Sequence, residues 1–179
     1  IRFTGDVQNL LDEHHSVLAD LELSTAIVAV LVLLSMAIYF RSLAGTAAVG
    51  ISLFAGTLWT FGVSYFVVGY LNANSAFLGS IVLGNGINLG IVLLASYLET
   101  RHRMLHKDAL PIAIRAALPG TLTAALAAGL AYGSLGFTTF RGFNQFGVIG
   151  LIGMLLCWIA AFTFLPALLT VFDRIWPHS

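Results

Sequence analysis

The most polar stretch within an apolar part of this sequence is Gly84-Asn85-Gly86-Ile87-Asn88-Leu89-Gly90. Asn85 and Asn88 are three residues apart, so on a helix their amides share one face. An unpaired polar group costs several kcal/mol in hydrocarbon, so these side chains need partners there. Two interpretations stay open. The amides could line a path for an ion or a substrate head group, or they could bond across a helix interface that Gly86 and Gly90, spaced as G-x-x-x-G, allow to close.

The chain offers little else that could carry chemistry. No acid or base lies in the middle of an apolar run, and no nucleophile elbow, phosphate-binding loop or carboxylate pair is present. We therefore expect neither an enzyme nor a cofactor. His14 and His15 follow two acidic residues, but adjacent side chains on a helix diverge, so we predict no metal site. Cys157 is the single cysteine, and we expect it to serve in packing.

Composition places these residues in a membrane. Of 179 residues, 59% are hydrophobic and only 9% are charged, whereas a soluble domain carries about 25% charge. The mean hydropathy is +0.95. The net charge is zero, with 8 basic and 8 acidic residues, so there is no basic excess to bind nucleic acid. A soluble enzyme and a nucleic-acid-binding module are both disfavoured, and a membrane protein is indicated.

Stretches without charged residues define the membrane spans. A crossing needs about 20 apolar residues, and the run from Ser42 to Leu98 is long enough for two, with a polar turn near Asn72 and Asn74. We predict an all-α bundle within residues 23–172. Its five helices are expected at about 23–40, 43–70, 74–98, 116–136 and 143–172.

Basic residues at the predicted span ends set the orientation. Six of them fall on one side: Arg41, Arg101, Arg103, Lys107, Arg115 and Arg174. By the positive-inside rule that side is cytoplasmic. We therefore predict an exterior amino end and a cytoplasmic tail over residues 173–179.

Two amphipathic segments lie outside the predicted spans. Residues 1–22 have apolar side chains at helical spacing, which predicts the end of an exterior domain and its stem helix. Residues 99–115 mix cationic and apolar side chains and contain Pro111, which predicts a separate cytoplasmic interfacial helix. An exterior amino end without an earlier span leads us to expect a piece of a longer protein.

A second pair of small residues lies in the fourth predicted span. Gly129 and Gly133 repeat the G-x-x-x-G spacing, with Tyr132 beside them. We interpret this pair as a helix-packing face.

Taken in order, the segments resemble one transmembrane half of the resistance-nodulation-division (RND) superfamily, and within it the MMPL-like lipid exporters, including the hopanoid-transporter branch. The resemblance covers nearly the whole chain. Its motifs are Phe3-Thr4-Gly5, Tyr39-Phe40-Arg41-Ser42, Leu58-Trp59-Thr60-Phe61-Gly62, Gly84 to Glu99, Thr121-Leu122-Thr123, Phe140-Arg141-Gly142-Phe143-Asn144-Gln145-Phe146-Gly147 and Leu165-Pro166-Ala167-Leu168-Leu169.

The resemblance implies spans two to six of a six-span half of the sterol-sensing-domain-like type. It also implies a bacterial inner membrane, with residues 1–22 as the end of a periplasmic domain. The expected partners are then membrane lipids or a hydrophobic substrate, together with the first span, the periplasmic domains and the second half. A homo-oligomer is left open.

Such proteins are proton-driven exporters with an acid on the fourth span of at least one half. By the resemblance, that acid and its neighbour would fall at Asn88 and Leu89, with Thr121 and Thr123 as polar partners. Asparagine cannot titrate, so coupling would pass through the other half.

We therefore expect part of an exporter that moves a hydrophobic or lipid substrate from the inner membrane toward the periplasm, with Asn88 inside the bundle. One alternative is a non-pumping, sterol-sensing-like module that binds lipid or a partner, which the absence of a membrane-embedded acid favours. A SecD/SecF-like protein-export accessory ranks last, because none of its distinctive sequence is present.

Overall fold

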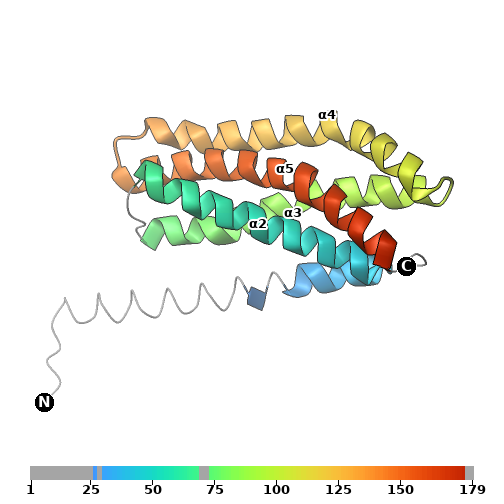
Figure 1. Ribbon diagram of the computed structural model, residues 1–179. Coiled ribbons are helices and arrows are strands. Elements are labelled where there is room, and N and C mark those ends of the chain that lie inside the picture. The colour runs from blue at the N-terminus through green and yellow to red at the C-terminus, as the bar shows by residue number, and fades with distance from the viewer. Residues whose placement is uncertain (1–25, 28–29, 69–72, 176–179) are drawn as a thin grey trace, which may run out of the picture.

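The computed structural model describes residues 26–27, 30–68 and 73–175, and the regular structure of that part is helical (Figure 1). The elements are the Val30–Phe40 helix, α2 (Leu43–Val68), α3 (Ala73–Arg101), α4 (His106–Gly133), the short 3-10 helix η1 (Ser134–Phe137) and α5 (Arg141–Ile175). The all-α prediction is confirmed. The expected stem helix at 1–22, the start of the first span and the end of the tail at 176–179 lie outside the described residues.

Four of these helices are long and apolar enough to cross a membrane. Their apolar segments are Leu43–Val67, Ile81–Arg101, Lys107–Phe137 and Arg141–Arg174, and Val30–Phe40 is a shorter apolar helix. At 1.5 Å per residue, the 35 residues of α5 extend about 50 Å, which exceeds a hydrocarbon core of about 30 Å. The chain is therefore a multi-pass membrane protein.

Helix α5 is central and packs against α2, α3 and α4 (Figure 1). The largest core cluster lies towards the end where α3 joins α4. There Leu93 and Leu94 of α3 and Leu165 of α5 are fully buried against Val49 of α2. In a membrane, the lipid is as apolar as these side chains, so their stabilisation comes mainly from close packing.

Glycines let three helices approach closely in the middle of the bundle. A Cβ at Gly56 of α2 would lie 3.0 Å from the Cα of Cys157 on α5, and one at Gly86 of α3 would lie 3.1 Å from Cys157 Sγ. Hydrogen is therefore the largest side chain that fits at Gly56 without moving a backbone. Among the other packing candidates, a Cβ at Gly90 would lie 2.9 Å from Val49, and Cβ atoms at Gly129 and Gly133 would contact Leu151 at 3.1 and 3.4 Å.

The segment 99–115 differs from the sequence-based expectation. Residues 99–101 complete α3, and α4 begins at His106 and continues through Pro111 without forming a separate interfacial helix. The reason is packing, because Ala109, Ala113 and Ala117 are buried in the main core cluster and extend α4 along the bundle. Proline is tolerated in membrane helices when other groups satisfy the backbone carbonyl that it leaves without a donor.

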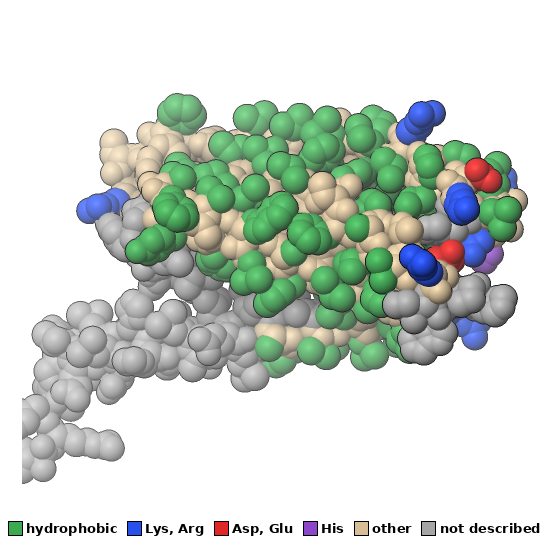
Figure 2. All heavy atoms as spheres, viewed as in Figure 1, with side chains coloured by type: hydrophobic (Ala, Val, Ile, Leu, Met, Phe, Trp, Pro, Cys, Tyr) green, Lys and Arg blue, Asp and Glu red, His purple; other side chains and the backbone are tan. Residues whose placement is uncertain are grey.

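Charged side chains gather at the end of the bundle where α3 joins α4 and α5 ends (Figure 2). This distribution follows from the topology, since α2 and α4 begin there while α3 and α5 end there. Arg101 of α3 and Asp173 of α5 form an ion pair of 3.0 Å across this end. Arg141 begins α5 at the opposite end.

Candidate functional site

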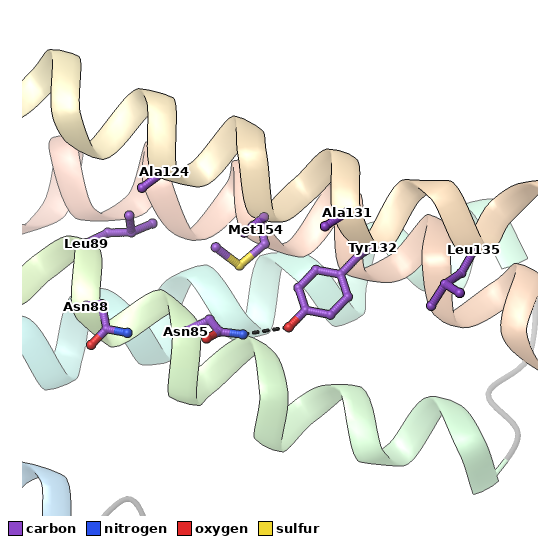
Figure 3. A pocket seen from close by; sticks show the side chains of 9 residues that line it. Asn85, Asn88, Leu89, Ala124, Ala131, Tyr132, Leu135 and Met154 are labelled. Carbon is purple, nitrogen blue, oxygen red and sulfur yellow. Dashed lines mark hydrogen bonds between the residues drawn. The ribbon is translucent and has the colours of Figure 1, made fainter.

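The polar motif of α3 meets α4 through one short hydrogen bond. The Asn85 amide nitrogen donates to the Tyr132 hydroxyl at 2.6 Å, and both side chains are half-buried (Figure 3). Asn85 therefore has an interhelical partner in the membrane, as the cost of an unpaired amide requires.

The Tyr132 ring is held by α5. It packs against Phe146 with ring centroids 6.1 Å apart, and a Cβ at Gly150 would lie only 2.8 Å from the Tyr132 ring. Because glycine has no side chain, Gly150 leaves the space in which the Tyr132 ring lies. Because its ring is fixed by α5, the Tyr132 hydroxyl is held facing α3.

This hydrogen bond lies in a pocket between α3 and α4 with a volume of about 580 Å³. The lining combines two amides and one phenol with small or apolar side chains, several of which Figure 3 shows directed into the space. The lining residues are Asn85, Asn88, Leu89, Ala124, Ala128, Ala131, Tyr132, Leu135 and Met154. Volumes of about 300–1,000 Å³, with mostly apolar walls and a few polar groups, are typical of sites for small molecules.

The pocket opens on the outer face of the bundle. Asn88, Ala124 and Ala131 are exposed, whereas Leu89 is 4% exposed and packs with Met154 in a buried cluster. The expectation that Asn88 lies inside the bundle is wrong for this chain, because its side chain borders the open side of the pocket. Within the described residues, the Asn88 amide has no hydrogen-bond partner.

The structure brings Asn85, Asn88 and Leu89 together and leaves Thr121 and Thr123 outside the lining. The Thr121 hydroxyl is buried against α5, where it donates to the Ala117 carbonyl at 2.7 Å and accepts from Trp158 Nε1 at 3.3 Å. Thr123 is exposed, and its hydroxyl donates to the Pro119 carbonyl at 2.8 Å. Both hydroxyls therefore make hydrogen bonds to groups other than Asn88.

Tyr132 is the polar member of the site that the sequence did not single out. The sequence shows that Tyr132 is a phenol within a predicted span. Its distance to Asn85 depends on the rotation of α4 about its axis, which the sequence does not show. Ala124, Ala128 and Ala131 follow helical spacing on the same face, and their small size leaves the pocket unfilled. The lining formed by these described residues contains no carboxylate, ammonium or imidazole, so it can bind by hydrogen bonds and apolar contact but cannot exchange protons through such a group.

Comparisons with known proteins agree with this membrane architecture. The family model described as "MMPL family" matches residues 1–179. Hopanoid transporter HpnN from Burkholderia multivorans is 28% identical over 96% of this chain and 20% of its own length, and its counterpart from Rhodopseudomonas palustris is 29% identical over 97% and 20%. Putative membrane protein MJ1562 from Methanocaldococcus jannaschii is 26% identical over 96% of this chain and 44% of its own length.

The chain therefore spans about a fifth of the hopanoid transporters and less than half of the archaeal relative. The match of the family model extends over the whole chain and includes all the helices that form the α3–α4 pocket. On this evidence, the chain belongs to the MMPL family.

Proposed function

We propose that this chain is the transmembrane part of an exporter that moves a hydrophobic or lipid substrate from the inner membrane toward the periplasm. The observation that carries the proposal is the α3–α4 pocket, where the Asn85–Tyr132 pair lies among apolar walls. Membership of the MMPL family and similarity to two hopanoid transporters support a lipid substrate.

The pocket has the chemistry that an amphiphile requires. Its alanine, leucine and methionine side chains suit a hydrocarbon body, while the amides of Asn85 and Asn88 suit a polar head group. Because the pocket opens at the outer face of the helices, a lipid could reach it without crossing the packed core of this chain.

The same pocket suits a half-transporter that does not carry the proton. Asn88 is neutral at every pH of biological interest, so the driving proton would be carried by the second half of the whole protein. We propose that this second half covers the exposed face of α3 and α4. Helix α4 is the least buried of the four membrane-crossing helices, which supports a missing neighbour on this face.

The proposal also fixes an orientation. Arg41, Arg101, Arg103, Lys107 and Arg174 lie at or beyond helix ends on one side of the bundle, and Arg115 lies in α4 near the same side. Under the positive-inside rule, this side faces the cytoplasm and the α4–α5 connection faces the periplasm.

A non-pumping lipid-binding module is the second candidate. It is favoured by the lack of any titratable carboxylate or imidazole in the pocket lining formed by the described residues. A module of this kind would bind lipid at the α3–α4 pocket and would show no lipid-dependent proton flux.

The test is proton flux through the whole protein in liposomes with and without hopanoid lipid. Wild type is compared with Asn88→Leu and Asn88→Asp, and Thr123→Val is the control because Thr123 is exposed outside the pocket. Lipid-dependent flux that Asn88→Leu reduces and Thr123→Val leaves unchanged would support a coupled exporter. No flux in any variant, with lipid still bound, would support the binding module instead.

A further inference from the structure

The connection between the Val30–Phe40 helix and α2 contains an arginine in an unusual backbone conformation. Arg41 has a φ of 51°, which lies in the left-handed region, and it is the non-glycine residue with positive φ among those the structure describes. Its N–H donates to the Ala37 carbonyl at 3.0 Å, and the next residue, Ser42, accepts from the Gly45 N–H at 3.1 Å through its side chain. Only two residues therefore reverse the chain.

Glycine or asparagine adopts this conformation at lower cost than arginine. The turn itself gains nothing from a guanidinium group, because its hydrogen bonds use the backbone and Ser42. An observed strained residue is a reason to look for a function of its side chain. The property that distinguishes arginine here is its permanent positive charge.

An apolar groove of about 550 Å³ begins beside this turn, between the Val30–Phe40 helix and α2. It is lined by Val30, Leu33, Leu34, Ala37, Leu43, Thr46, Ala47, Gly50 and Ile51. The one hydroxyl in this lining belongs to Thr46 and already donates to the Ser42 carbonyl at 2.9 Å. The groove therefore offers contact to hydrocarbon and no free polar group.

Residues that line the groove flank Arg41 in the sequence, on both sides of the turn. Ala37 and Leu43, which flank Arg41, are both groove residues, and the α2 lining continues through Ile51, about 12 Å further along the helix axis. Arg41 is exposed and takes part in no ion pair within the described residues, unlike Arg101 with Asp173. The turn that carries this cation thus lies at one end of a groove that runs along the Val30–Phe40 helix and α2.

We propose that this groove is a binding site for one anionic phospholipid, with its phosphate on Arg41 and an acyl chain between the Val30–Phe40 helix and α2. A lipid is favoured over a neighbouring helix because an acyl chain matches the apolar lining while its charged head group matches Arg41. The site is separate from the α3–α4 pocket and does not depend on the proposed transport function.

The test is native mass spectrometry of the whole protein after incubation with equal amounts of phosphatidylglycerol and phosphatidylcholine. Arg41→Gln removes the charge, Arg41→Lys keeps it, and Arg115→Gln removes an exposed charge from α4 as the matched control. One basic contact near a membrane surface is worth about 1 kcal/mol, so Arg41→Gln should lower the preference for phosphatidylglycerol roughly fivefold. Arg41→Lys and Arg115→Gln should retain most of it.

A second pair of variants tests the groove without changing charge. Ala47→Phe fills the groove from an exposed position, and Ala167→Phe places the same side chain on an exposed position of α5. The site is supported if Ala47→Phe loses binding of both lipids and Ala167→Phe retains it. The proposal is overturned if wild type retains neither lipid, if Arg41→Gln and Arg115→Gln reduce the preference equally, or if Ala47→Phe binds as wild type does because a helix occupies the groove.

Discussion

The Tyr132 hydroxyl of α4 lies 2.6 Å from the Asn85 amide nitrogen of α3, which joins two membrane helices by a polar contact 47 residues apart in sequence. The ring that carries this hydroxyl lies over Gly150 of α5. Three helices therefore set the position of one hydrogen bond, and this bond joins two of the three polar side chains that line the α3–α4 pocket.

Removing the phenol oxygen should weaken this junction. We expect Tyr132→Phe to lower the free energy of unfolding by about 1 kcal/mol, the usual range for an interhelical hydrogen bond in a membrane. Tyr65→Phe is the control, because Tyr65 is 68% exposed on α2. Steric-trapping measurements in bicelles would compare the two variants, and an equal effect of both would contradict a special role for the Asn85–Tyr132 bond.

The close approach of α2 and α5 should make Gly56 intolerant of a methyl group. A Cβ there would lie 3.0 Å from the Cα of Cys157, so Gly56→Ala forces two backbones apart, and we expect a loss of about 1–3 kcal/mol. At Gly62 on the same helix, a Cβ would meet nothing within 4 Å. Gly62→Ala should therefore be neutral or stabilising in the same unfolding assay. Equal stability of Gly56→Ala and Gly62→Ala would be inconsistent with the packing described.

Ser64 is a buried hydroxyl whose removal should help stability. Its Oγ is the buried side-chain polar atom without a hydrogen-bond partner in the part of the chain that the structure describes. We expect Ser64→Ala to raise the free energy of unfolding by about 1 kcal/mol, since no bond is lost and a desolvated hydroxyl is removed. Ser52 donates to the Ala48 carbonyl at 2.7 Å, so Ser52→Ala should give no such gain. A loss of stability in Ser64→Ala would mean that the hydroxyl has a partner in the membrane.

The ion pair between Arg101 and Asp173 should contribute little. Their side chains are 31% and 25% exposed, so solvent and salt weaken the attraction, and Asp173→Asn should cost less than about 1 kcal/mol. The cost should shrink further between 50 mM and 500 mM salt, conditions chosen to span roughly a threefold change in Debye length. A large loss that is independent of salt would show that Asp173 acts through packing.

The turn at Arg41 gives a prediction about strain. Arg41→Gly should stabilise the protein by on the order of 1 kcal/mol, because glycine adopts a φ of 51° without the steric cost of a Cβ. Thermal unfolding in a neutral detergent isolates this backbone effect from lipid binding. A decrease in stability would show that the Arg41 side chain makes a contribution of its own to the fold.

The sequence was most informative about the spans and least informative about helix rotation. Charge-free runs located α2, α3, α4 and α5, because only apolar segments of that length can lie in hydrocarbon. The start of α4 was predicted wrongly, since the burial of Ala109 and Ala113 depends on tertiary contacts with other helices. The mixture of cationic and apolar residues in the segment 99–115 by itself indicates a separate interfacial helix.

The candidate site was predicted in part for the same reason. Asn85 and Asn88 stood out as amides in an apolar run, and both line the pocket. Thr121 and Thr123 were expected near them, but positions two apart on a helix point in different directions, so both could not face Asn88. Tyr132 was missed because α4 is apolar on nearly every face, and its pattern does not reveal which face meets α3.

The central claim is that the α3–α4 pocket holds the transported lipid. Its most direct test is lipid transfer by the whole protein in proteoliposomes, comparing wild type with Ala124→Leu and Ala167→Leu. Both alanines are exposed, but Ala124 lines the pocket and Ala167 lies on α5 outside it. We expect Ala124→Leu to reduce transfer about tenfold, because overpacking the pocket should cost roughly 1.4 kcal/mol of lipid binding. Ala167→Leu should have no effect. Equal transfer by wild type and both variants would contradict the claim.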